Sequence, residues 1–186
     1  MELLVAGLLL WFVFHTMPSA APALRQKIVD RMGENPYKGL VAVLTLVSLA
    51  LIVFGWRGSV ASHLYQLPPF TRHLGMLLVL IAFIVFGTTS YPSRIKQYVR
   101  HPQLAGVSIW AFAHLMMNGD SRSIVLFGTM FIWAILSIAL INRRDGEWVK
   151  QPVPSWAREI RGFIISLVVF VVVVVIHPYI TGMAIF

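Results

Sequence analysis

The sequence predicts an all-α protein, a polytopic bundle of about six transmembrane helices with both termini on the periplasmic side. Hydrophobic residues make up 58% of the 186 residues and charged residues only 12%, whereas a soluble domain is about 45–50% apolar and about 25% charged. The mean hydropathy is +0.79. Apolar segments of about one membrane width recur along the chain, and basic residues gather in alternate loops between them.

Six apolar segments approach the roughly 20 residues that a transmembrane helix needs. They cover residues 2–17, 39–56, 74–91, 102–118, 122–141 and 162–182. Proline and glycine residues separate them and indicate turns. No hydrophilic stretch is long enough for a soluble domain, so we expect a single membrane domain over residues 1–186.

The first segment could be mistaken for a secretory signal, because the small residues 19–23 follow it. A signal peptide begins with basic residues, and here Glu2 is the only charge before the apolar run. We therefore expect a helix that starts outside. Residues 24–38 are too polar to span, but their apolar positions recur at helical spacing, which predicts a short amphipathic helix at the cytoplasmic interface. Residues 142–161 are hypothesised to do the same.

The fourth and fifth segments are expected to form a tight helical hairpin. Pro102 stands where the first turn of a helix favours proline, and Gly119 stands where a helix end favours glycine. Asp120 or Ser121 can then cap the next helix.

The loop charges predict the orientation. The first, third and fifth loops hold 12 of the 15 Lys and Arg residues, and Arg57, Arg72 and Arg122 lie in the other two. Basic loops face the cytoplasm, so we expect both termini on the opposite, outer side of the membrane. With so little polar surface, the net charge of +8 is a topology signal, and we expect the lipid bilayer and not nucleic acid as the partner.

The absence of certain residue types and motifs excludes several chemistries. The chain has no cysteine, which excludes disulfides, thiolate metal sites and covalently attached c-type haem. It has no phosphate-binding or dinucleotide-binding glycine motif and no metalloprotease or hydrolase motif.

Histidines are the candidate functional residues. Five of the six lie in or at the ends of apolar segments: His15, His73, His101, His114 and His177. Ionisable groups in hydrocarbon are costly and often functional. A neutral imidazole is a natural ligand of haem iron, but composition alone does not choose haem over a metal ion or a proton path.

His15 and His114 lie inside spans of different helices, as two axial ligands of one iron should. They lie about 20 Å and about 18 Å from the starts of their helices, which run in opposite directions. Trp110 and Asn118 share the helix face of His114, and could offer a porphyrin a ring and a hydrogen bond; Trp11 shares the face of His15.

Four further residues are candidates at the ends of the spans. Arg72 and Arg100 are placed to bind haem propionates, on opposite sides of the membrane. His73 and His101 are also candidate cofactor-binding residues, although their position at span ends favours solvated or capping roles.

These motifs resemble the NnrU family of bacterial membrane proteins and, more distantly, the plant 15-cis-zeta-carotene isomerase. The matching residues are His15 with Pro18-Ser19, Gly33-Glu34, Tyr37, Arg72-His73-Leu74, Tyr91-Pro92, Arg100-His101-Pro102-Gln103, Trp110, Ala113-His114-Leu115, Asn118-Gly119 and Ile176-His177-Pro178. The block from Arg100 to Gly119 is the most specific part.

The resemblance implies a membrane protein linked to nitrite and nitric oxide metabolism, with denitrification or other redox membrane proteins as partners. The isomerase branch implies a haem b held by His15 and His114, and a redox-dependent cis-to-trans isomerisation. Some isomerase-type motifs carry a cysteine where this chain has Ala111, so a thiolate ligand switch is excluded here.

The sequence therefore supports several functions and does not decide whether the chain is an enzyme. A haem b protein with a redox or nitric-oxide-related role comes first. The alternatives are a haem-dependent isomerase of a polyene lipid and a cofactor-free accessory protein. A transporter is weaker, because no convincing pair of broken helices is present.

Overall fold

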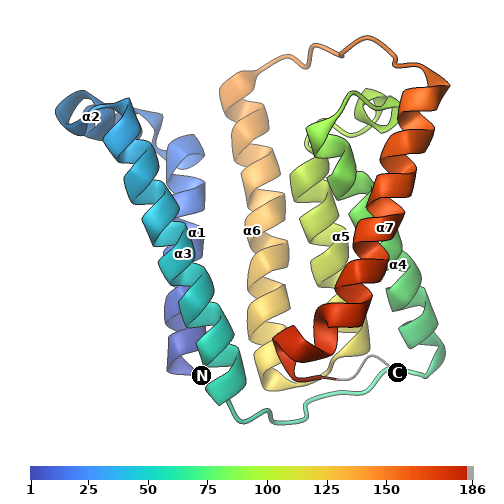
Figure 1. Ribbon diagram of the computed structural model, residues 1–186. Helices are drawn as coiled ribbons and strands as arrows, with labels where there is room; N and C mark the ends of the chain where they lie inside the picture. Colours follow the sequence, from blue (N-terminus) through green and yellow to red (C-terminus); the bar gives the residue numbers. More distant parts are fainter. Residues whose placement is uncertain (184–186) are drawn as a thin grey trace. The chain divides into compact units, whose positions relative to one another are not determined.

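The computed structural model describes residues 1–183 and is all-α within that range (Figure 1). It contains seven α-helices and two short 3₁₀ helices, and the described residues form no strand beyond an isolated bridge between His63 and Asp120. The helices form two compact units, Met1–Ser62 and His63–Phe186, which are described separately.

The first unit is a helical hairpin with a short helix at its turn. It consists of α1 (Glu2–Ala20), α2 (Pro22–Met32) and α3 (Glu34–Gly58). A short helix, α2, is present where one was expected over residues 24–38, but it stops at Met32, and residues 34–38 already belong to α3. Between the two helices lies Gly33, whose φ of +89° is open to glycine but strained for other residues.

Glycines bring α1 and α3 into close contact. A β-carbon on Gly7 would lie 2.8 Å from the main-chain nitrogen of Ile52, and one on Gly55 would overlap the main chain of Leu4. Small residues at such crossings allow membrane helices to pack by van der Waals contact, because apolar burial gives little driving force inside lipid.

The second unit is a helical bundle in which α5 packs against both α4 and α6, while α4 also packs against α7. Its elements are α4 (Phe70–Gly87), η1 (Thr88–Ser90), η2 (Arg94–Gln97), α5 (Pro102–Met117), α6 (Ser121–Asp145) and α7 (Trp156–Thr181). The tight hairpin expected between the fourth and fifth segments is formed by α5 and α6.

Within residues 1–183, 5 stretches of helix are long and apolar enough to cross a membrane: α1, α3, α4 with η1, α6 and α7. The chain is thus a multi-pass membrane protein. The remaining expected span is α5, whose 16 residues give a length of about 24 Å, short of the roughly 30 Å hydrocarbon core.

The structure corrects the hypothesis of an interfacial helix over residues 142–161. Helix α6 continues to Asp145, and α7 begins at Trp156. The segment between them is not helical, because Gly146 has a φ of +65° and the prolines at 152 and 154 cannot donate main-chain hydrogen bonds.

Candidate functional site

His114 lies in the last turn of α5 and is held there by its own helix. Its Nδ1 lies 2.9 Å from the carbonyl oxygen of Trp110. Because a carbonyl only accepts, Nδ1 carries the hydrogen, and in the neutral ring Nε2 carries the lone pair. Among the described residues, Nε2 of His114 has no hydrogen-bond partner.

Aromatic side chains fix the plane of the His114 ring. Phe127 of α6 stacks on it, with ring centroids 4.5 Å apart and planes 29° from parallel. Trp110 contacts both rings, 4.9 Å from His114 and 5.1 Å, edge-on, from Phe127. The imidazole is therefore held in one orientation by neighbours from two helices.

His15 in the first unit has the same local arrangement. Its Nδ1 lies 2.9 Å from the carbonyl oxygen of Trp11, and the Trp11 ring stacks on it with centroids 4.0 Å apart and planes 14° from parallel. A histidine that binds a metal usually donates its other ring N–H to a carbonyl or carboxylate, which fixes the tautomer. Both rings therefore meet this requirement for ligation through Nε2.

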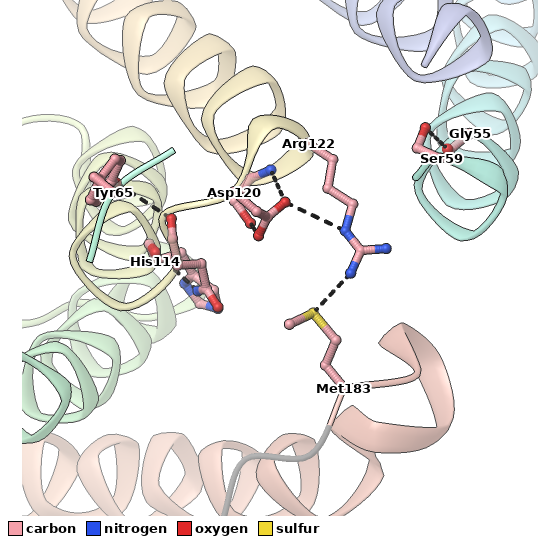
Figure 2. A network of polar contacts seen from close by, with 9 residues as sticks. Gly55, Ser59, Tyr65, His114, Asp120, Arg122 and Met183 are labelled. Atoms are coloured by element: carbon pink, nitrogen blue, oxygen red, sulfur yellow. Dashed lines mark hydrogen bonds and ion pairs between the residues drawn. The ribbon is translucent and has the colours of Figure 1, made fainter. Parts of the chain in front are cut away.

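The turn after His114 is anchored by the loop that precedes α4 (Figure 2). The Tyr65 hydroxyl donates to the carbonyl of Leu115, and the main-chain N–H groups of Leu64 and Tyr65 donate to the carbonyl of Gly119 at 2.8 and 3.1 Å. The carbonyls at the end of a helix lack partners within the helix, so this loop supplies them.

Asn118 and Asp120 have local roles in the same turn. The Asn118 amide nitrogen donates to the carbonyl of His114 at 3.0 Å. Asp120 caps α6 by accepting from the main-chain N–H of Ser123 at 3.1 Å and from its hydroxyl at 2.5 Å. Arg122 lies 3.5 Å from Asp120 and donates to the sulfur of Met183 at 3.6 Å (Figure 2).

Arg72 and His73 lie exposed in the first turn of α4, at the same end of the bundle as His114. The neighbouring Thr71 hydroxyl is 3.5 Å from the carbonyl of Met116, and Gly75 packs directly against Met117. This places the start of α4 beside the end of α5.

Arg100 and His101 lie at the opposite end of α5, about 20 Å from His114 along the helix. Arg100 donates to the carbonyl of Gly146 at 2.7 Å. His101 Nε2 lies 2.9 Å from the side-chain oxygen of Asn142. Both join the start of α5 to the end of α6.

Sequence reasoning omitted two residues from the site around His114. Phe127 and Tyr65 were not singled out, because their contacts depend on which helix and loop pack against α5. His177 of α7 was among the five candidate histidines but was not paired with His114, to whose electrostatic environment it contributes. Its Nδ1 is 3.3 Å from the Thr181 hydroxyl, and the His-Pro pair in an apolar helix was the available signal.

The described residues contain no group of three or more His, Cys, Asp or Glu side chains that could hold a metal ion. This finding does not bear on haem, which needs only one or two protein ligands.

The long apolar helices define the class of protein as a multi-pass α-helical membrane protein. The chain belongs to the NnrU family, described as NnrU protein, whose pattern it matches over residues 3–185. Neither a curated protein nor a solved structure matches the chain. The similarity to the plant isomerase therefore stays a prediction carried by the shared motifs.

Proposed function

We propose that this NnrU protein is an inner-membrane haem b protein in which His15 and His114 ligate the iron. The observation that carries the proposal is the shared arrangement of the two rings. Each has Nδ1 committed to the carbonyl of the tryptophan four residues earlier, and each is in contact with the ring of that tryptophan, which is stacked on His15 and tilted against His114. The carbonyl contact prepares Nε2 as a ligand. The two histidines come from different helices, as bis-histidine ligation requires.

The protein groups have distinct tasks in this proposal. The Trp110 carbonyl holds the His114 proton, and Phe127 keeps the ring from turning. Arg72, which is exposed at the His114 end of the second unit, is proposed to bind a propionate. Arg100 and His101 hold α5 to α6, so we assign them to the scaffold. When bound, haem supplies one-electron redox chemistry and an iron that binds nitric oxide.

The proposed role is redox or nitric-oxide-related and connected with denitrification. The membrane arrangement that goes with it has six spans, including α5, and both termini in the periplasm, as the positive loops indicate. Isomerisation of a polyene lipid is the alternative enzyme activity, and it requires a direct assay of carotenoid turnover.

The test is an absorption spectrum of the purified protein, oxidised and reduced, after expression with ample haem. We expect a Soret band in the wild-type protein and its loss or shift in His15→Ala and in His114→Ala. His63→Ala, which changes an exposed histidine, is the matched control and should leave the spectrum unchanged. A colourless, folded wild-type protein would overturn the proposal and favour the accessory role.

His177 requires its own variant, because this histidine also contributes to the electrostatic environment of His114 and could replace His15 as the second ligand. If His177→Ala removes the band and His15→Ala does not, the ligand pair is wrong while haem binding stands. Binding of nitric oxide or carbon monoxide to the reduced protein then measures whether a ligand is displaceable, which a nitric-oxide-related role needs.

A further inference from the structure

A cavity of about 710 Å³ lies between α4 and α7, within the second unit. Most of its wall is apolar and is formed by Phe83 and Phe86 of α4 and by Ile165 and Val169 of α7. The α7 residues among these are exposed on the helix surface. In a membrane protein, such a groove faces lipid chains and not water.

One end of the cavity is basic. Arg158 and Arg161 line it together with the polar residues Ser90 and Tyr91. Both arginines are exposed, and within residues 1–183 neither forms an ion pair. No Asp or Glu lines the cavity among the described residues.

The nearest acidic residue in sequence, Glu159, is engaged elsewhere. Its carboxylate accepts from the Ser93 hydroxyl at 2.7 Å and from the main-chain N–H of Arg94 at 2.9 Å. These bonds hold η2 against the start of α7, so the carboxylate is committed to Ser93 and Arg94 and does not pair with either arginine of the cavity.

The basic end lies at headgroup depth. Trp156, in the first turn of α7, is 64% exposed, and the Arg94 guanidinium lies 4.1 Å from the centre of its ring. Exposed tryptophan beside arginine is typical of the membrane interface. From Arg158 to Val169 the helix rises about 16 Å, close to half of the roughly 30 Å hydrocarbon core.

Two glycines allow close packing at the polar end of the cavity. A β-carbon on Gly162 would overlap the Tyr91 ring, and one on Gly87 would overlap the Ser166 hydroxyl. Ser166 in turn donates to the carbonyl of Gly162 at 3.0 Å. Glycines at these two positions therefore let Tyr91 and α4 lie directly on α7 at the end of the groove.

We propose that this groove binds one anionic glycerophospholipid, with its phosphate at Arg158 and Arg161 and one acyl chain along Phe86, Ile165 and Val169. The two charges and the adjacent hydroxyls match a phosphodiester headgroup, and basic pockets between membrane helices bind such headgroups. From Arg158 to Val169 the groove runs for about 16 Å, close to the thickness of one leaflet, which fits one lipid with its headgroup at the arginines. The proposal does not depend on haem.

The test is lipid binding to the full-length protein in detergent, measured by native mass spectrometry. The probes are phosphatidylglycerol and phosphatidylcholine with identical acyl chains. We expect phosphatidylglycerol to bind at least about tenfold more tightly, because each surface arginine favours an anionic lipid by about fivefold. The Arg158→Gln/Arg161→Gln double variant should lose that preference and bind both lipids alike.

The control is Arg143→Gln/Lys150→Gln, which removes the same charge from two other exposed positions and should keep the preference. Val169→Trp places a larger side chain in the apolar part of the groove and should weaken the binding of both lipids by a similar factor. Circular dichroism checks that each variant is folded. Equal wild-type affinity for the two lipids, an equal loss in the control, or full competition by inorganic phosphate would overturn the proposal.

Discussion

The Tyr65 hydroxyl donates a hydrogen bond to the main-chain carbonyl of Leu115, the residue that follows His114. The same hydroxyl lies 3.4 Å from the carbonyl of Asn118, and the Tyr65 main-chain N–H donates to the carbonyl of Gly119 at 3.1 Å. The loop before α4 is therefore attached to the helix end that carries His114. The position of this histidine depends on a residue far from it in sequence.

Removal of that hydroxyl should destabilise the second unit. Tyr65→Phe keeps the ring but leaves the Leu115 carbonyl without the donor it has in the wild type. Because the site is only partly buried, the loss should be close to the net contribution of one hydrogen bond, about 0.5–1.5 kcal/mol. We expect a lower midpoint of thermal unfolding in detergent, followed by circular dichroism.

Tyr98→Phe is the matched control for this change. Tyr98 is 86% exposed, so loss of its hydroxyl should leave the midpoint unchanged. Equal midpoints for Tyr65→Phe and the wild type would show that the Tyr65 bond adds nothing to stability.

The same tyrosine gives a prediction about pH. Burial, and then the nearby Asp120 carboxylate, raise the pKa of Tyr65 above its usual value of about 10. The folded state therefore holds the phenolic proton more tightly than the unfolded state. The resulting stabilisation is fully present below the unfolded pKa of about 10, and it is lost as pH rises through the folded pKa. A titration of tyrosinate absorbance, with Tyr65→Phe subtracted, measures the shift.

Asp120→Asn separates the two causes. Asparagine also caps helices well, so the cap that Asp120 provides to Ser123 should survive while the charge is lost. We expect the pKa of Tyr65 to fall part of the way toward its usual value, because burial remains. A pKa that does not move at all would mean that Asp120 does not act on the phenol.

Gly119 should not tolerate a side chain. A β-carbon there would overlap the main-chain carbonyl of Tyr65, and neither segment can move without breaking the hydrogen bonds between them. Overpacking of this kind costs about 1–3 kcal/mol, so Gly119→Ala should lower the unfolding midpoint. Gly128→Ala is the control, since no atom outside its own helix lies within 4 Å of the new carbon, and its midpoint should not fall.

The sequence predicted the presence of the helices better than their ends. Hydropathy marks only the part of a helix that lies in the hydrocarbon core, and a helix can continue beyond that core into the headgroup region. The third apolar segment was predicted from residue 74, whereas α4 begins at Phe70. The sixth was predicted from residue 162, whereas α7 begins at Trp156. In both cases the added turn carries polar or charged residues such as Arg72 or Arg158, which a helix accommodates at headgroup depth.

The site was predictable only where it depends on spacing within one helix. Trp110 lies four residues before His114, so their contact follows from the helical repeat, and it is present. Phe127 and Tyr65 reach the site through packing between helices and through a loop, which spacing does not encode. The pairing of His15 with His114 stays a prediction, because the two lie in different compact units.

The number of spans can be tested with cysteines, because the chain has none of its own. Single cysteines at Glu2, His63, Lys27 and Lys150 occupy exposed positions. With six spans, a membrane-impermeant maleimide should label Glu2→Cys and His63→Cys in intact spheroplasts. Lys27→Cys and Lys150→Cys should react only after permeabilisation, because the basic loops face the cytoplasm.

Lys150→Cys decides the status of α5, the short helix that carries His114. If α5 entered the membrane without crossing it, α6 would run outward and the segment between α6 and α7 would be periplasmic. Lys150→Cys would then react in intact spheroplasts while Lys27→Cys stayed protected. Protection of both positions supports six spans and places His114 in a helix that crosses the bilayer, as ligation of a membrane haem requires.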